Sequence, residues 1–441
     1  MLPFLTVPAG LAEVLAACRG AFGVPSFWTF TALVTGVLGA TGPRTVTGMW
    51  TAAGLAGKLH WSRAHWFFAY GAWDLDNPGL LLARTVVGAF TAPGQALTVA
   101  VDDTLFHRFG KKVFGAAWQH DGSAKGRDGI GRGNCFVVVG LVVHVPFLAR
   151  AVFLPVLFRL HVPNSAKKPN PEATASKTAQ ARQMLNQLSR AFPERRIHLV
   201  ADALYRGPAL LDLPGNTTFT SRLASNAVLY DLPPGPTGRR GRPALKGRRL
   251  GKPADLATTA TFQKATVTRY GATETVLLAV IDCLWWGSLH RTPIRVVLVR
   301  DPDSTKAYDI ALITTDLEAT PETIVARYAD RWSEEQTIKD CKDLLGAGDA
   351  ASRLPVAVHR TVPFTMLCLT ILVLWYAHSG NAAGDVAAHR MASPWYRHKR
   401  HVSVADMLIA FRRARITAVR PAHNTPDLFD HDTVTWAGAA A

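Results

Sequence analysis

Cysteine is scarce in this sequence: there are five in 441 residues, and no two of them form a Cys-x-x-Cys pair. This spacing argues against a structural zinc site and against a disulfide framework, and it is typical of a reducing compartment. A secretory signal is not expected either, because no Lys or Arg precedes the apolar stretch before Cys18 and Glu13 interrupts it. We therefore expect a cytoplasmic protein.

The sequence also lacks a long apolar run that is free of charge. Its most apolar stretch, 136–160, contains His144, Arg150, Arg159 and two prolines, whereas a membrane span needs about 20 residues that are nearly uncharged. The β-branched residues of this stretch favour buried strands. A second apolar stretch, 363–376, predicts a core helix. We expect no membrane association.

Acidic residues are few relative to basic ones, with 32 Asp and Glu against 49 Lys and Arg and a formal net charge of +17 at pH 7. Such an excess attracts polyanions, since each phosphate that a cation neutralises releases condensed counterions. The hydrophobic fraction of 48% and the charged fraction of 18% are those of a folded globular chain. The length predicts two to four packed units.

Two segments with strand-like patterning end in acidic residues. An apolar β-branched run from 96 ends in Asp102 and Asp103, and a second run from 195 ends in Asp202. Because strand ends in a parallel-type sheet line one edge, these carboxylates can converge, and oxygen ligands of this kind suit divalent cations. Solvated loop carboxylates are the alternative interpretation.

A third acid lies in a segment with helical patterning that runs from 321 to 345. Four residues there stand at the spacing Y-x2-R-x3-E-x6-K: Tyr328, Arg331, Glu335 and Lys342. On one continuous helix these positions fall along one stripe, where they could meet a metal and a phosphate backbone together. The alternative is an exposed, ion-paired helix, which Glu334 and Asp340 would serve equally well.

This pattern resembles the insertion-sequence transposases of the DDE superfamily, in the group with a Tyr-Arg-Glu-Lys signature. Asp103-Thr104 resembles the motif of the first acid, and the segment from His198 to Tyr205 resembles that of the second. The resemblance implies an α/β fold: a ribonuclease H-like mixed sheet flanked by helices, interrupted by a β-rich insertion, with an N-terminal helical domain. The interval of 335 − 202 = 133 residues before the glutamate leaves room for that insertion.

On this resemblance we expect five segments. They are a helical DNA-binding domain (1–95), the first part of the catalytic core (96–206), a β-rich insertion with a basic loop (207–320), the second part of the core (321–380), and a basic helix with a tail (381–441). Within the first segment, 45–73 predicts two short helices. They either present a DNA-reading helix or pack their aromatic residues into a core, these being Trp61, Trp66 and Phe67.

The resemblance also implies the site residues. Asp103, Asp202 and Glu335 would bind two Mg²⁺ or Mn²⁺ ions, Arg331 and Lys342 would hold DNA phosphates, and Tyr328 would contact the backbone. Asp102 competes with Asp103, which directly precedes the threonine. Glu334 competes with Glu335, which alone satisfies the spacing.

The implied activity is that of a DNA transposase, which cleaves the ends of its element and joins them to target DNA. The implied partners are double-stranded DNA, as terminal inverted repeats and target, and a second protomer in a homodimeric end complex, with a nucleoid-associated location in the cytoplasm. The alternatives are a transposase-derived DNA-binding protein that no longer cuts and a metal-dependent nuclease that acts on RNA.

Two further features have competing interpretations. Arg240 and Arg242 lie in an Arg-Arg-Gly-Arg-Pro segment that resembles an AT-hook, whose arginines enter a narrow minor groove. A flexible basic loop that binds backbone without base choice is the alternative. Trp286, in the pair Trp285-Trp286, either stacks on a flipped base or lies buried in the sheet.

Overall fold

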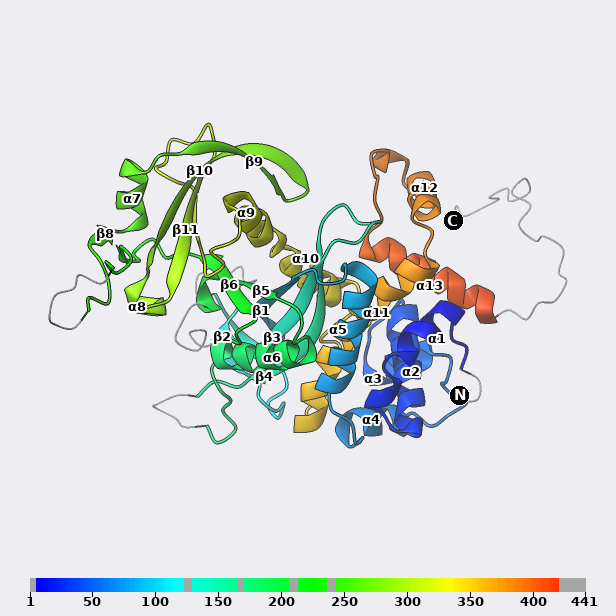
Figure 1. The fold of residues 1–441 in the computed structure, drawn as a ribbon. Coiled ribbons are helices and arrows are strands. Elements are labelled where there is room, and N and C mark those ends of the chain that lie inside the picture. The colour runs from blue at the N-terminus through cyan, green and yellow to red at the C-terminus, as the bar shows by residue number, and fades with distance from the viewer. Residues whose placement is uncertain (1–4, 123–128, 165–169, 206–212, 236–242, 420–441) are drawn as a thin grey trace.

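The structure is a computed structural model that describes residues 5–122, 129–164, 170–205, 213–235 and 243–419. Its core sheet lies at the centre of Figure 1, between a β-rich lobe on the left and a helical lobe on the right. Arg240 and Arg242 lie outside the described residues.

Five strands form the core sheet, in the order β4-β3-β1-β5-β6. Strand β1 (Leu97–His107) pairs antiparallel with β3 (Ile130–Val143), and β3 pairs antiparallel with β4 (Val152–His161). On the other side of β1, β5 (Ile197–Ala201) and β6 (Thr217–Arg222) run parallel to it. An antiparallel three-stranded unit extended by two parallel strands is the ribonuclease H-like arrangement, which confirms the predicted fold class.

The apolar stretch 136–160 forms most of β3 and β4 rather than a helix, as its β-branched residues predict. Nearly every residue of both strands is buried because helices cover both faces of the sheet. Helix α11 (Pro355–Ser379) is the one helix among the described residues that is long and apolar enough to cross a membrane. In this fold 83% of its apolar window is buried against neighbouring elements.

The core sheet continues into the β-rich lobe. Strand β12 (Ile310–Thr314) pairs antiparallel with β6, so that the described strands form one sheet of 12. The remaining strands of the lobe are β7 (Leu229–Tyr230), β8 (Arg249–Gly251), β9 (Gln263–Arg269), β10 (Ala272–Leu284) and β11 (Pro293–Arg300). It also contains α7 (Pro253–Thr259) and α8 (Trp286–Leu289), and β2 (Ala117–His120) pairs with β3 at the far edge. Although β6 lies inside the predicted 207–320 insertion, it belongs to the core sheet by its hydrogen bonds with β5.

Helices cover the core sheet on both faces. One face carries α5 (Asp76–Phe90) and α6 (Lys177–Ala191), which share contacts with Arg159 of β4; α6 crosses in front of the core strands in Figure 1. The opposite face carries α10 (Ser333–Asp343) and α11. The helical lobe adds α1 (Ala9–Ala16), α2 (Val24–Gly39), α3 (Val46–Ala52), α4 (Ser62–Ala69), α12 (Ala382–Ala392) and α13 (Val404–Val419).

The prediction of one continuous helix over 321–345 is wrong. Helix α9 (Pro321–Asp330) begins with Thr320 as N-cap and ends before Arg331, and α10 begins at Ser333. The chain makes a tight turn between them, in which the amides of Arg331 and Trp332 bond the carbonyls three residues back. Tyr328 and Arg331 therefore do not share one helical stripe with Glu335 and Lys342.

Candidate active site

Asp102 and Asp202 lie side by side on one face of the core sheet. Strands β1 and β5 run parallel with Val101 opposite Ala201, so the next residue on each strand, Asp102 and Asp202, continues the same register. Residues at the same level of neighbouring strands point to the same face. The predicted position at a strand end holds for Asp202, but Asp102 lies in the middle of β1, which continues to His107.

The carboxyl group of Asp102 is held away from solvent. Its Oδ1 accepts a hydrogen bond from the backbone amide of Asp103 at 2.8 Å. Burial raises the pKa of Asp102 to about 7, and the negative charges of Asp103 and Asp202 contribute in the same direction, while that hydrogen bond and Arg331 oppose the shift. An acid crowded by two others in this way gains stability from any cation that reaches it.

Arg331 is a cation that acts on Asp102 from the turn between α9 and α10. Its side chain is 6% exposed, and its guanidinium donates from Nη1 to Glu334 and from Nη2 to Glu335 at 3.4 Å. Although burial lowers it, the pKa of Arg331 is raised by the charge of Glu334, and Asp102 adds to this effect. Arg331 therefore neutralises part of the negative charge that the two sheet acids and α10 bring together.

The two neighbouring glutamates of α10 differ in exposure. Glu334 is fully buried, and burial together with the charge of Asp102 raises its pKa well above the usual range. Among the residues that the structure describes, its Oε2 has no hydrogen-bond partner. The side chain of Glu335 is 45% exposed and is free to change rotamer at the surface.

Tyr328 and Lys342 complete the predicted set. Tyr328 is 6% exposed and packs in an apolar cluster with Val200, on the face that carries Asp202; burial raises its pKa and Asp202 adds to the shift. The Lys342 ammonium lies 5.1 Å from the ring centroid of Phe106 and within electrostatic range of Asp102; burial lowers its pKa. The structure thus brings Tyr328, Arg331 and Lys342 around the acids. Tyr328 packs against apolar side chains and Arg331 pairs with Glu334, so both contact other parts of the protein.

Asp103 points to the opposite face of the sheet from Asp102, as alternation along a strand requires. Its Oδ2 forms an ion pair with the Lys177 ammonium of α6 at 2.5 Å, and its Oδ1 accepts from the Tyr205 hydroxyl at 3.2 Å. The Cys135 thiol also donates to Oδ2, at 3.4 Å. These contacts tie β1 to the turn that follows Asp202, and so fix the spacing between the two strands that carry the acids.

The donor set is suited to a hard divalent cation. Among the described residues, no three His, Cys, Asp or Glu side chains stand close enough together to hold a metal ion. Asp102 and Asp202 nevertheless supply neighbouring oxygen ligands, and Oε2 of Glu334 is a buried oxygen without a hydrogen-bond donor among the described residues. Rotation of the exposed Glu335 side chain could supply a further oxygen.

The other predicted contacts lie farther from these acids. Trp285 is buried, whereas Trp286 is partly exposed, with the Lys246 ammonium 5.2 Å from its ring centroid. Trp286 follows β10, five strands from β1 in the sheet order, which at the usual strand spacing corresponds to about 24 Å.

The sequence left open whether the aromatic residues of the N-terminal helices pack in a core or lie exposed where they could contact DNA, and the structure contains residues of both kinds. Phe67 is buried, while Trp61 and Trp66 are each 53% exposed. Trp66 lines a cavity of about 970 Å³ between α4 and the segment before α11, which includes Arg353. The helices are therefore packed together, and they also leave aromatic side chains on an open groove.

Comparison with known families agrees with this geometry. A family model described as DDE superfamily endonuclease matches residues 27–278, which is 252 of the 441 residues and more than half of the chain. The chain belongs to the DDE superfamily of endonucleases. No curated protein matches the chain.

The part of this DDE endonuclease that matches the family model includes Asp102, Asp103 and Asp202 and ends within β10. It does not include α9 and α10, so the assignment of the acid on α10 depends on the structure and on the residue spacing. Sequence reasoning missed Lys177 and Tyr205 as partners of Asp103. The available signal was the alternation of a strand, which allows only one of two adjacent acids to face the site.

Proposed function

We propose that this DDE endonuclease is a DNA transposase of the group with the Tyr-Arg-Glu-Lys signature, which cleaves the ends of its element and joins them to target DNA. The observation that carries the proposal is the register of β1 and β5, which sets Asp102 beside Asp202 on the face covered by α10. A pair of carboxylates on adjacent strands next to a helix with a further acid is suited to phosphodiester chemistry with two metal ions.

We assign the first metal ligand to Asp102 rather than to Asp103, which the sequence favoured. Asp103 faces the other side of the sheet, where Lys177 and Tyr205 occupy its oxygens. Asp202 is the second ligand. Glu335 is the third, because it keeps the signature spacing and remains accessible, whereas Glu334 is fully buried against Arg331.

The residues around the acids have distinct tasks in this proposal. Two Mg²⁺ or Mn²⁺ ions, when bound, would supply an activated nucleophile and stabilise the leaving oxygen. Lys342, on the same helix as Glu335 and within the electrostatic range of Asp102, would hold a phosphate of the reacting strand. Arg331 holds Glu334 in place and offsets the charge of the acids, and Tyr328 supports the loop that carries Arg331.

The proposed substrate is double-stranded DNA, as terminal inverted repeats and target. The net charge of +17 favours binding to it and a nucleoid-associated location in the cytoplasm. Trp286 and Lys246 form an aromatic and basic contact at the far end of the sheet, suited to DNA beyond the reacting bond. Arg240 and Arg242 would add backbone contacts, and the end complex would contain two protomers.

Cleavage of a labelled duplex carrying the gene's own flanking terminal repeats tests the proposal. We expect nicking at the repeat ends with Mg²⁺ or Mn²⁺, none with EDTA, and joined products when target DNA is added. Glu335→Gln should bind the duplex and not cut it, with Glu334→Gln as the matched variant. Binding without cutting by the wild-type protein would instead support a DNA-binding protein derived from a transposase. Cutting of RNA alone would support an RNA nuclease.

If Glu335→Gln cuts normally while folded Glu334→Gln does not, the third ligand is Glu334. Far-ultraviolet circular dichroism of both variants separates loss of activity from loss of fold, which matters because Glu334 is the buried partner of Arg331.

A further inference from the structure

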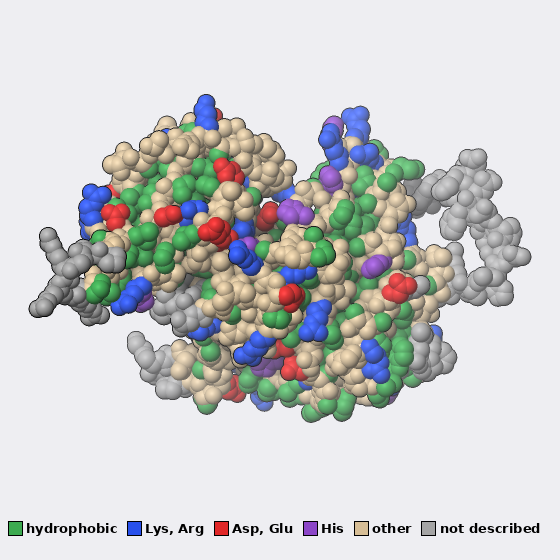
Figure 2. Space-filling view, in the orientation of Figure 1, with side chains coloured by type: hydrophobic (Ala, Val, Ile, Leu, Met, Phe, Trp, Pro, Cys, Tyr) green, Lys and Arg blue, Asp and Glu red, His purple; other side chains and the backbone are tan. Residues whose placement is uncertain are grey.

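The turn between α12 and α13, together with the end of α12, carries a dense group of basic side chains. We name residues 389–401 the basic tip. The segment reads His-Arg-Met-Ala-Ser-Pro-Trp-Tyr-Arg-His-Lys-Arg-His, with four Lys or Arg, three His and no Asp or Glu. Figure 2 shows these blue and purple side chains gathered at the top of the helical lobe, across a hollow from the β-rich lobe. The segment lies outside the residues that match the family model.

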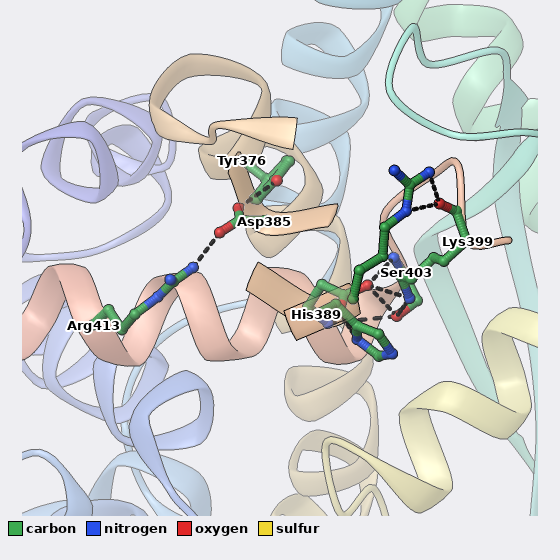
Figure 3. Close-up of polar contacts among 8 residues, drawn as sticks. Tyr376, Asp385, His389, Lys399, Ser403 and Arg413 are labelled. Atoms are coloured by element: carbon green, nitrogen blue, oxygen red, sulfur yellow. Dashed lines mark hydrogen bonds and ion pairs between the residues drawn. The ribbon is translucent and has the colours of Figure 1, made fainter. Parts of the chain in front are cut away.

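Buried acids hold the basic tip in a fixed shape. Asp406, 4% exposed, accepts from His389 Nδ1 at 2.8 Å and pairs with the Lys399 ammonium at 2.7 Å. The amide and hydroxyl of Ser403 also donate to Asp406, each at 2.7 Å. Arg390 donates to the Lys399 carbonyl at 2.8 Å, which closes the turn. These contacts lie on the right side of Figure 3.

A second polar group fixes the helices on which the basic tip stands. Asp385 of α12 accepts from the Tyr376 hydroxyl of α11 at 2.6 Å and forms an ion pair with Arg413 of α13, as Figure 3 shows. Helices α11, α12 and α13 are therefore tied together through one carboxylate. A surface ordered in advance loses little conformational entropy when it binds a partner.

Two arginines and two histidines of the basic tip remain without a protein partner in the part of the chain that the structure describes. They are all exposed: Arg397, His398, Arg400 and His401. Trp395 is 80% exposed and Tyr396 is 57% exposed beside them. Exposed cations held close together repel one another, and an array of phosphates relieves this repulsion while the aromatic side chains contact sugars or bases.

We propose that the basic tip binds the phosphate backbone of DNA as a contact separate from the acids of the core sheet. An anionic membrane is the less suitable partner, because most of the large apolar side chains of α13 face the protein interior: Met407, Leu408 and Phe411 are at most 2% exposed, whereas Ile409 and Ile416 are exposed singly. A membrane-binding helix needs that face free. The inference rests on the proposed function, since it supplies a second contact for the same substrate.

The test compares Arg397→Glu/Arg400→Glu with a control of equal charge change, Arg84→Glu/Arg190→Glu, whose residues are exposed on α5 and α6. Binding of a fluorescent 40-base-pair duplex is measured by anisotropy from 50 to 300 mM salt. We expect the tip variant to bind at least about tenfold more weakly at 100 mM salt, with the slope of log K against log salt lower by about 2, as for two lost phosphate contacts. The affinity of the control variant for the duplex should change by less than about twofold, because the expected loss depends on where the charges lie and not on the net charge alone.

Equal affinity and slope for the tip variant and the wild type would overturn the proposal while leaving the proposed function intact. Wild-type protein that neither binds nor cuts DNA would contradict both this proposal and the proposed function. If wild-type protein binds vesicles of phosphatidylserine, the tip variant does not, and DNA binding is the same for both, the partner is a membrane surface and the proposal is wrong.

Discussion

Replacing Asp102 with Asn should stabilise the metal-free protein, whereas the same change at the adjacent Asp103 should destabilise it. Asp102 is a partly exposed acid whose pKa rises from 3.8 to about 7 on folding. This rise in pKa corresponds to about 4 kcal/mol, by which ionisation of the carboxyl group destabilises the folded state relative to the unfolded chain. Asn keeps the oxygen that accepts from the Asp103 amide and removes the charge.

The direction of the pKa shift of Asp102 sets the pH range in which the substitution changes stability. The unfolded chain releases the Asp102 proton near pH 4 and the folded protein near pH 7, so wild-type stability falls between these values as pH rises. The free energy of unfolding of Asp102→Asn should equal that of the wild type below about pH 4. It should exceed the wild-type value increasingly up to about pH 7, and by a constant amount above that pH. For 441 residues melting as one unit, 4 kcal/mol corresponds to about 4 °C in Tm.

Asp103→Asn is the matched control. It leaves the Lys177 ammonium, whose side chain is 18% exposed, without its carboxylate partner and should lower the free energy of unfolding by about 2–4 kcal/mol. Thermal melts by circular dichroism in EDTA from pH 4 to pH 9 measure both effects. Asp102→Asn melting below the wild type at pH 8, or Asp103→Asn melting above it, would refute the placement of the two acids on opposite faces.

Three further changes follow from the contacts of the site. Lys177→Met should cost about 2–4 kcal/mol of unfolding free energy in denaturant melts, because Asp103 loses its cation and keeps the neutral Tyr205 and Cys135 as side-chain partners; stability equal to wild type would contradict this. Arg331→Met should cost about 3–5 kcal/mol of unfolding free energy, because it leaves the buried carboxyl group of Glu334 without its cation; a melting curve close to that of the wild type would count against the ion pair. Lys342→Ala should leave the melting curve nearly unchanged and slow cleavage at least about tenfold, since a phosphate contact in the reaction is lost; unchanged cleavage would remove Lys342 from the site.

The fold could be predicted from the sequence where local pattern and burial agree. The β-branched run 136–160 forms β3 and β4, and the runs before Asp102 and Asp202 form the parallel pair β1 and β5. The membership of β6 in the core could not be predicted, because a strand inside an apparent insertion shows its partner only through long-range hydrogen bonds.

The sequence indicated which segments meet at the candidate site, but not how they are arranged there. The spacing from Tyr328 to Lys342 locates the segment beside the acids, but the turn at Arg331 that separates α9 from α10 depends on packing against the sheet. The choice between Asp102 and Asp103 needed the register of β1 with β5. The partners of Asp103 come from α6 and the turn after β5, 74 and 102 residues away in sequence, and no local pattern indicates them.

Metal-dependent cleavage of terminal-repeat DNA tests whether Asp102 and Asp202, and not Asp103, bind the metal ions. The variants are Asp102→Asn, Asp202→Asn and Asp103→Asn, each assayed at a protein concentration where it is folded and binds the duplex. The pairing of β1 with β5 predicts no cleavage by Asp102→Asn and Asp202→Asn, and measurable cleavage by Asp103→Asn. Cleavage by Asp102→Asn at the wild-type rate, with none by Asp103→Asn, would contradict the account.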